Sequence, residues 1–372
     1  MLKKKVVALG LSVLMTASMF MGCGSEGNSG VETSSDDTVK ITLAIPGALG
    51  DKGFNDASQA GMDKIKETFG DKVEVETVEL GFDKAKFEPG LQDVSESDAD
   101  IILTGTWDMK EIVERNASLY KDKKYIVFDT DVAYDEYDLE NVYSMTYKQN
   151  EAGFLAGALA ALVTTSDMEN VNADKKIGFV GARDTSAVIN DFLVGYIQGA
   201  QFIDKDIKVE VSYVGSFTDS SKAKEMTLAQ YSKGVDVVFT AAGPASIGSI
   251  EAAAETKNYV IGVDSDQALA FEGKEEAKFI ISSALKKVDN SLVLAIENLL
   301  NDTLEFNTHS ELGIAEDAIG LANNDIYTSV VPQEIRDKVE EAKKSLLEGK
   351  ITLESAIGLE DSRLQEIINS AK

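Results

Sequence analysis

Six short runs of apolar residues recur along the sequence, and each run is continuous rather than alternating with polar residues. β-Strands that are buried on both faces, as in parallel sheets, have this pattern. The runs are Val39–Ile45, Asp100–Thr104, Lys124–Asp129, Lys176–Gly181, Val235–Thr240 and Tyr259–Asp264. Patterns of helical period separate or follow them, at Asp56–Phe69, Met109–Leu119, Glu151–Val163, Ser186–Phe202, Lys222–Tyr231 and Ile247–Glu255. This alternation predicts doubly wound α/β units.

The length of the chain and the order of these segments indicate two lobes. The chain has 372 residues, of which 44% are hydrophobic, and this is enough for two domains of ordinary size. Three of the strand runs precede Asn150 and a new series begins at Lys176, so we expect a boundary near Asn150. The predicted fold class is α/β, with two doubly wound lobes and a ligand cleft between them.

Polar or glycine residues end several of the predicted strands. These endings are Thr104-Gly105, Asp129, Gly181, Thr240 and Asp264. In open parallel sheets, ligands bind at the carboxyl ends of the strands. Any single polar ending is explained by an ordinary turn, but five endings of the same kind indicate a binding edge.

The N-terminal residues have the features of an export signal. Three lysines precede an apolar stretch of about 16 residues, which is shorter than the roughly 20 residues that a bilayer span needs. Residues 1–22 are therefore predicted to be a signal peptide, and the polar residues 23–38 a flexible tether. The sequence Phe20-Met21-Gly22-Cys23 resembles a lipobox. It predicts acylation of Cys23 and a lipid anchor on the extracytoplasmic face of the cell membrane. An ordinary signal peptide with a chance cysteine is the alternative, because Phe20 and Met21 depart from the usual lipobox residues.

The composition argues against several classes of function. The formal net charge of −28 disfavours nucleic acid as a partner. Cys23 and His309 are the only cysteine and histidine, which removes most His-based triads and Cys- or His-rich metal sites. The acidic stretch that begins at Asp129 has Ala133 and Tyr134 where a calcium loop needs a ligand and a glycine. We expect no metal, no cofactor and no catalytic residue, although the many carboxylates leave a hydrolytic carboxylate pair open.

Two glycine-containing loops follow predicted strands. Free backbone N–H groups after Gly47–Gly53 could hold a polar ligand group, and Asp56 with Gln59 is predicted to form a capping box there. The second loop, Gly243–Gly248, contains Ser246 but lacks the spacing of a nucleophilic serine. It predicts a turn and a helix start.

Six segments, taken in order, carry a resemblance to a known family. They are Gly50–Asp56, Gln149–Gly157, Asp191–Tyr196, Ala242-Gly243, Ile261–Gln267 and Ser283–Asp289. The chain resembles the basic membrane protein family of substrate-binding lipoproteins of ABC importers, which includes purine-nucleoside receptors. The resemblance implies a monomer with a type I periplasmic-binding-protein-like fold. It implies a first lobe of residues 39–149 plus 268–305, and a second lobe of residues 150–267 plus 306–372.

The resemblance also implies roles for individual residues. Phe54 and Phe192 match two phenylalanines that sandwich the base of a nucleoside, an interaction worth roughly 1–3 kcal/mol per base in nucleic-acid binders. Asp264 matches a carboxylate that accepts hydrogen bonds from the ribose hydroxyls. Lys286 matches a donor to the sugar, and it is also expected to balance the charge of Asp264. Core packing is the alternative role for each phenylalanine.

Four further residues complete the expected ligand site. Asn55 and Asp129 are candidates for the edge of the base, with N-capping and a solvated strand end as their alternatives. Gly243 would let the backbone approach the sugar. Trp107 lies near the expected cleft and departs from the residues usual in the family, so it bears on the identity of the ligand.

Together these observations predict a lipid-anchored receptor that captures a nucleoside, with purine favoured, for import by an ABC permease. Riboflavin or a sugar is an alternative ligand. A surface enzyme that cleaves nucleosides through Asp129, Asp131 or Asp264 is an alternative of another class, and a sensor that does not transport its ligand is a third.

Overall fold

The computed structural model describes residues 38–372. The predicted signal peptide, Cys23 and nearly all of the predicted tether lie outside the described residues. Residues Thr38–Lys372 form one unit, and within it no helix has both the length and the apolar character needed to cross a bilayer.

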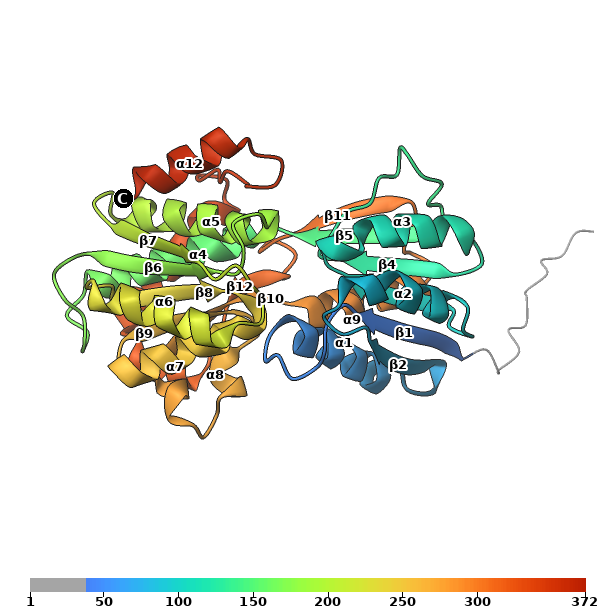
Figure 1. Cartoon of the computed structure of the whole chain (residues 1–372), viewed down its shortest axis with the longest axis horizontal. Coiled ribbons are helices and arrows are strands. Elements are labelled where there is room, and N and C mark those ends of the chain that lie inside the picture. The colour runs from blue at the N-terminus through green and yellow to red at the C-terminus, as the bar shows by residue number, and fades with distance from the viewer. Residues whose placement is uncertain (1–37) are drawn as a thin grey trace, which may run out of the picture. The chain divides into compact units, whose positions relative to one another are not determined.

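Two six-stranded sheets organise the described part of the chain, and each forms the centre of one lobe (Figure 1). The first has the order β11-β5-β4-β3-β1-β2 and is parallel throughout. The second has the order β12-β10-β9-β8-β6-β7 and is parallel except at β12. The strands of the first sheet are β1 (Val39–Ile45), β2 (Val73–Glu79), β3 (Ile101–Gly105), β4 (Lys124–Phe128), β5 (Val142–Tyr147) and β11 (Thr308–Leu312). Those of the second are β6 (Lys176–Gly181), β7 (Lys208–Tyr213), β8 (Val237–Ala241), β9 (Tyr259–Asp264), β10 (Ile280–Lys286) and β12 (Ile319–Leu321). The predicted fold class is confirmed.

The six predicted strands are the central ones, β1, β3, β4, β6, β8 and β9, and the strands that the pattern missed lie at or next to the sheet edges. The edge strand β2 shows why, because its sequence Val-Glu-Val-Glu-Thr-Val-Glu alternates and its three glutamates are exposed. An edge strand keeps contact with water, so it does not require a continuous apolar run.

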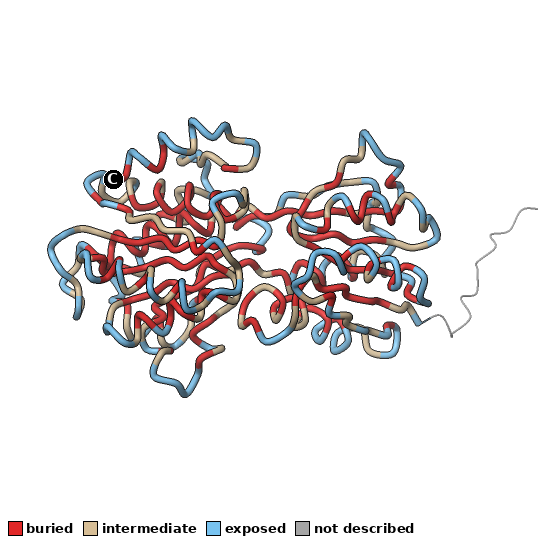
Figure 2. The backbone as a smooth tube through the Cα atoms, in the orientation of Figure 1, coloured by how far each residue is buried: buried red, intermediate tan, exposed pale blue. Residues whose placement is uncertain are grey.

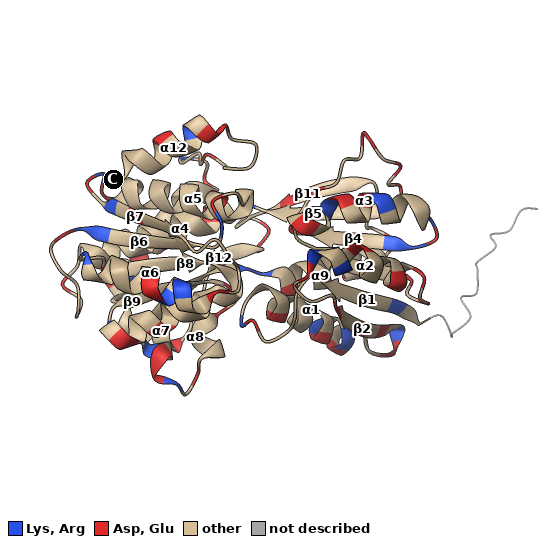
Figure 3. Cartoon of the chain, in the orientation of Figure 1, with Lys and Arg blue, Asp and Glu red and all other residues tan. Residues whose placement is uncertain are grey.

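Helices flank both sheets. They are α1 (Phe54–Phe69), α2 (Phe87–Ser95), α3 (Lys110–Leu119), α4 (Gln149–Thr164), α5 (Ala187–Ile203), α6 (Ser220–Ser232), α7 (Ser246–Thr256), α8 (Gln267–Ala270), α9 (Val288–Leu300), α10 (Asp325–Val330), α11 (Gln333–Leu347) and α12 (Asp361–Ser370). Figure 2 shows that the buried backbone is concentrated in the strands and in α4 and α5. Charged residues lie mainly in the helices and loops (Figure 3). The predicted helices differ from the observed ones by one or two residues at most ends.

Four glycines let α4 and α5 approach until their backbones touch. A Cβ atom at Gly157 would lie 2.0 Å from the carbonyl oxygen of Tyr196, and one at Gly195 would lie 1.9 Å from that of Asn150. Gly153 and Gly199 are equally crowded, each by the backbone of the other helix. This close packing fixes the position of α5, which carries Phe192.

The structure corrects the residue ranges expected for the lobes in the C-terminal part of the chain. β10, expected in the first lobe, pairs with β9 in the second sheet, and β11, expected in the second lobe, pairs with β5 in the first. Between them, α9 packs against α1 of the first lobe. The chain therefore crosses between the lobes after β5, after β10 and after β11. The pattern of a single strand does not reveal these crossings, because it reports burial and not which sheet the strand joins.

Candidate functional site

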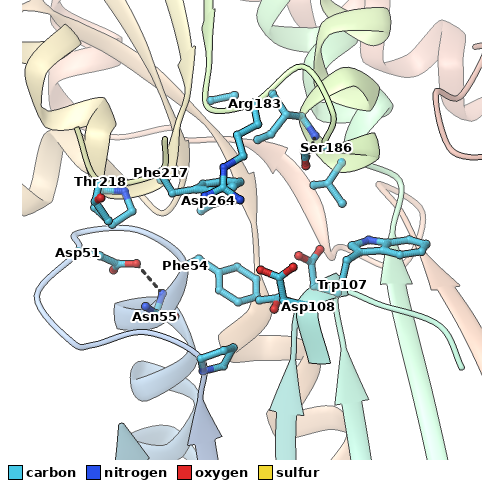
Figure 4. Close-up of a pocket in the computed structure, with 18 of the residues that line it drawn as sticks. Asp51, Phe54, Asn55, Trp107, Asp108, Arg183, Ser186, Phe217, Thr218 and Asp264 are labelled. Atoms are coloured by element: carbon cyan, nitrogen blue, oxygen red, sulfur yellow. Dashed lines mark hydrogen bonds between the residues drawn. The ribbon is translucent and has the colours of Figure 1, made fainter. Parts of the chain in front are cut away.

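A cleft of about 540 Å³ lies between the two lobes, lined by residues at the carboxyl ends of the strands. The order of the strands reverses beside β1 and β3 in the first sheet and beside β6 and β8 in the second. Such switch points are where doubly wound sheets bind ligands. The cleft is lined by all eight residues that the sequence predicted to bind ligand: Phe54, Asn55, Trp107, Asp129, Phe192, Gly243, Asp264 and Lys286. Figure 4 shows residues of both lobes facing this space.

An ion pair joins the lobes at the cleft. The Nζ atom of Lys286, at the end of β10, donates to the Oδ1 atom of Asp129, which follows β4, over 2.6 Å. Lys286 is 2% exposed and Asp129 is 8% exposed. Burial raises the pKa of Asp129, and the ammonium of Lys286 opposes this rise. The sequence led us to expect that Lys286 balances the charge of Asp264. This expectation is corrected, because the direct partner of Lys286 is Asp129, although the charge of Lys286 also lowers the pKa of Asp264.

The same ammonium lies among three aromatic rings. Its nitrogen is 5.6 Å from the ring centre of Phe54, 5.5 Å from that of Phe192 and 5.5 Å from that of Tyr147, which are cation–π distances. Phe54 comes from the first turn of α1 in the first lobe, whereas Phe192 comes from α5 in the second. One ring from each lobe therefore lines the cleft beside the buried ammonium of Lys286.

Each phenylalanine also packs against its own lobe. The ring of Phe54 is 5.7 Å from that of Phe128, and the ring of Phe192 is 5.7 Å from that of Phe239 in an edge-to-face arrangement. Phe192 is almost wholly buried and Phe54 is partly buried. Both residues thus line the cleft and also pack in the core, and this packing holds each ring in position.

Asp129 and Asp264 occupy matching positions in the two sheets, at the ends of β4 and β9. Both have left-handed backbone conformations, with φ of 60° and 67°. The carboxylate of Asp264 has no hydrogen bond or ion pair with any residue of 38–372. Burial raises its pKa to about 6; Lys286 opposes the rise, and Asp129 and Asp51 add to it. Strained residues with perturbed pKa values are typical of functional sites.

The pKa of Asp264 leads to a prediction for the ligand-free protein. The folded value of about 6 lies above the ordinary 3.8, so between these values the folded state binds the extra proton and its stability falls as pH rises. Asp264→Asn, which tolerates the left-handed backbone, should therefore raise the Tm at pH 7.5 and leave it nearly unchanged at pH 4. Thermal unfolding at both pH values measures this. The exposed Asp98→Asn is the control, and an equal shift at both pH values would contradict the prediction.

The loop after β1 is held by the carboxylate of Asp51. Its oxygens accept the N–H groups of Gly53, Asn55 and Asp56 at 2.9, 2.9 and 3.1 Å, and so cap the start of α1. The predicted capping box is wrong, because Asp56 instead accepts from the backbone of Gly50 and Lys52. Asp51 was not predicted from the sequence, because a capping aspartate is expected at the N-cap position itself, which here is Gly53.

The remaining predicted residues have less direct contacts. Asn55 donates its side-chain amide to the carbonyl of Ala48 over 3.1 Å, and it lies inside α1 and is not its N-cap. Gly243 has a φ of 57°, and its Cβ position would be 3.2 Å from the ring of Phe217. Trp107 is half-buried beside Lys110, whose nitrogen is 5.6 Å from its ring.

Several cleft residues were not foreseen from the sequence. They include Phe82, Lys84, Asp108, Arg183, Ser186, Phe217 and Thr218. Arg183 could have been found from its position just after the predicted strand Lys176–Gly181. Ligands bind at the carboxyl ends of parallel strands, and this rule, which selected Asp129 and Asp264, extends to the first one or two residues of the following loop.

The other sequence candidates lie elsewhere. Asp131 pairs with Lys110 over 2.7 Å and does not line the cleft. His309 lies in β11, where its ring nitrogens bond the hydroxyls of Ser144 and Thr146. Ser246 begins α7, as the turn prediction implies, and its hydroxyl accepts from the backbone.

Comparison with known proteins agrees with the resemblance found in the sequence. Residues 38–351 match the family described as Bmp, ABC transporter substrate-binding protein PnrA-like. Basic membrane protein A of Borreliella burgdorferi is 27% identical over 361 residues, which cover 96% of this chain and 98% of that protein. The ABC transporter nucleoside-binding protein BmpA of Lactococcus lactis subsp. cremoris is 26% identical over 368 residues, which cover 95% of this chain and all 100% of that protein.

A solved structure shares the fold. The crystal structure of an ABC transporter system solute-binding protein from Aeropyrum pernix K1 matches 90% of this chain and 97% of its own, with a TM-score of 0.77 and 23% identity. Because the family match spans most of the sequence and the two-lobed fold agrees with it, the chain belongs to the Bmp, or PnrA-like, family of ABC transporter substrate-binding proteins.

Proposed function

We propose that the cleft binds a purine nucleoside and that closure of the lobes presents it to an ABC permease. The observation that carries the proposal is a pair of rings from opposite lobes, Phe54 and Phe192, in one cleft with the carboxylate of Asp264, which has no partner among residues 38–372. A flat base can stack between such rings, while a carboxylate without a partner can accept from two vicinal hydroxyls. One relative is named a nucleoside-binding protein, which supports this assignment.

The remaining groups suit the same ligand. A cavity of about 540 Å³ is within the range of small-molecule sites. Asn55 and Asp129 both line the cleft, and their amide and carboxylate groups supply a donor and an acceptor for the edge of a base. Binding that engages side chains of both lobes favours the closed arrangement, and a ligand shifts this equilibrium by its differential affinity for the two states.

Thermal unfolding with a panel of ligands tests the proposal. Purine nucleosides should stabilise the protein by RT ln(1 + [L]/Kd), about 2.7 kcal/mol at a hundred times Kd, while riboflavin and free sugars should not. No stabilisation by any nucleoside would overturn the ligand assignment. Stabilisation by riboflavin or a sugar alone would favour the alternative ligands.

Two side chains should carry much of the affinity. Phe54→Ala and Asp264→Ala should each weaken nucleoside binding more than about tenfold, or about 1.4 kcal/mol, because one removes a stacking surface and the other a hydroxyl acceptor. Isothermal titration calorimetry measures the change. Phe202→Ala is the matched control, since Phe202 is 48% exposed and does not line the cleft. Unchanged affinity in both test variants would refute these roles.

Two assays separate the proposal from the other classes of function. Incubation with inosine should release no hypoxanthine, whereas steady release would favour a nucleoside-cleaving enzyme. Deletion of the protein should lower nucleoside uptake by cells, whereas unchanged uptake would favour a sensor.

The N-terminal sequence supports an anchored receptor. We propose that Cys23 is acylated and holds the protein at the outer face of the membrane, where tethering raises its concentration near the permease. Mass spectrometry of the mature N-terminus tests this. An unmodified cysteine, or cleavage at another residue, would remove the anchor from the proposal.

A further inference from the structure

Arg183 differs from the other arginines of the chain. Of the four arginines, Arg115 and Arg363 form ion pairs with glutamates, and Arg336 donates to the carbonyl of Val331. The guanidinium of Arg183 forms no hydrogen bond or ion pair within the described residues 38–372, although the backbone carbonyl of Arg183 accepts from the N–H of Ser186. The chain has 64 acidic residues against 36 basic ones, so an arginine without a carboxylate partner is unexpected unless something else supplies its acceptors.

The side chain of Arg183 is directed into the cleft. It follows β6, and Figure 4 shows it extending from its loop into the space between the lobes, toward Phe217. Its guanidinium carbon lies 5.3 Å from the ring centre of Phe217. Stacking on a ring restrains the plane of a guanidinium and leaves its N–H groups free to point outward at the edge.

The chemistry of a guanidinium limits its partner. It has five N–H donors and no acceptor, and its geometry matches two acceptors that lie side by side in one plane. Phosphate and carboxylate offer such acceptors but are negatively charged. The charged residues that line the cleft are Asp51, Lys84, Asp108, Asp129, Arg183, Asp264 and Lys286, four acids against three bases. Such a lining, in a chain of net charge −28, disfavours an anion and favours a neutral group with two adjacent acceptors.

We infer that Arg183 recognises the O6 and N7 acceptors of a 6-oxopurine, so that the protein prefers inosine and guanosine to adenosine. This inference depends on the proposed nucleoside site. Arginine pairs with O6 and N7 of guanine in this bidentate way, whereas adenine presents an amino donor in place of O6. In an adenosine complex the guanidinium would therefore face a donor and lose one of its two hydrogen bonds.

Calorimetric titration of the whole mature chain with three nucleosides tests the inference. The wild type should bind inosine at least about tenfold more tightly than adenosine. It should also bind 7-deazainosine, which lacks the N7 acceptor, several-fold more weakly than inosine. Arg183→Gln should weaken inosine binding about tenfold and bring all three ligands within about threefold of one another. Arg115→Gln is the matched control, because Arg115 lies outside the cleft and should leave the three affinities unchanged.

The outcomes distinguish this inference from the proposed function. Equal wild-type affinity for inosine and adenosine would overturn the role of Arg183 and leave the nucleoside site standing. A preference for inosine that persists in Arg183→Gln would do the same. If inosine 5′-monophosphate binds more tightly than inosine and the variant abolishes that gain, then Arg183 reads an anion, and the inference is wrong. Failure of every nucleoside to bind the wild type would overturn the proposed function itself.

Discussion

Lys286→Met is expected to lower the free energy of unfolding at pH 7.5 by about 3–5 kcal/mol, because it leaves the carboxylate of Asp129 buried without its partner. Methionine keeps most of the side-chain volume, so the loss arises mainly from the charge. Asp129 can escape part of the penalty by taking up a proton, and the loss should therefore be smaller at pH 5. Urea unfolding at both pH values measures the change.

Two further variants isolate the ion pair. Lys286→Met/Asp129→Asn removes both charges of the pair, so most of the stability should return. Lys84→Met removes a lysine from a pair with Asp108 whose side chains are 56% and 46% exposed, and should cost less than about 1 kcal/mol. A loss for Lys286→Met as small as that of this control would show that the buried pair does not hold the lobes together.

Gly195→Ala should destabilise the protein by about 3 kcal/mol or more. Alanine is the better helix former by about 1 kcal/mol, so an uncrowded position would gain stability. Here the new Cβ would lie 1.9 Å from the carbonyl oxygen of Asn150, and two backbones cannot separate without disturbing the neighbouring core. The clash should therefore outweigh the gain in helix propensity.

The matched measurement uses a glycine with open surroundings. Gly320→Ala meets no atom within 4 Å and should change the free energy of unfolding by less than about 0.5 kcal/mol. Because α5 carries Phe192, Gly195→Ala should also weaken nucleoside binding. Wild-type stability in Gly195→Ala would refute the close contact between α4 and α5.

Local patterns predicted the parts of the fold that are buried on all sides. β6 and β9 were bounded correctly from their apolar runs, because a strand covered on both faces and both edges excludes polar residues almost everywhere. The edge strands β2 and β7 alternate valine with polar residues, and such short patterns do not differ enough from loops or helices to be recognised.

The site was predicted by two routes. Polar endings of strands pointed to Asp129 and Asp264 by the general rule for parallel sheets, and both line the cleft. Phe54 and Phe192 were indicated only by resemblance, since a phenylalanine in an apolar helix pattern is ordinarily a core residue. Their ligand-binding roles stay predictions until affinities are measured.

The sequence by itself determined the central strands, six of the helices, the family and eight residues of the cleft lining, because each follows from burial within one element or from a short motif. The tertiary structure decided which sheet β10 and β11 join and which carboxylate holds Lys286, a partner 157 residues away. It also decided that the guanidinium of Arg183 contacts the ring of Phe217 and pairs with no carboxylate of residues 38–372. These features depend on contacts between distant segments, and the energy of a buried charge is set by whatever group the fold brings beside it.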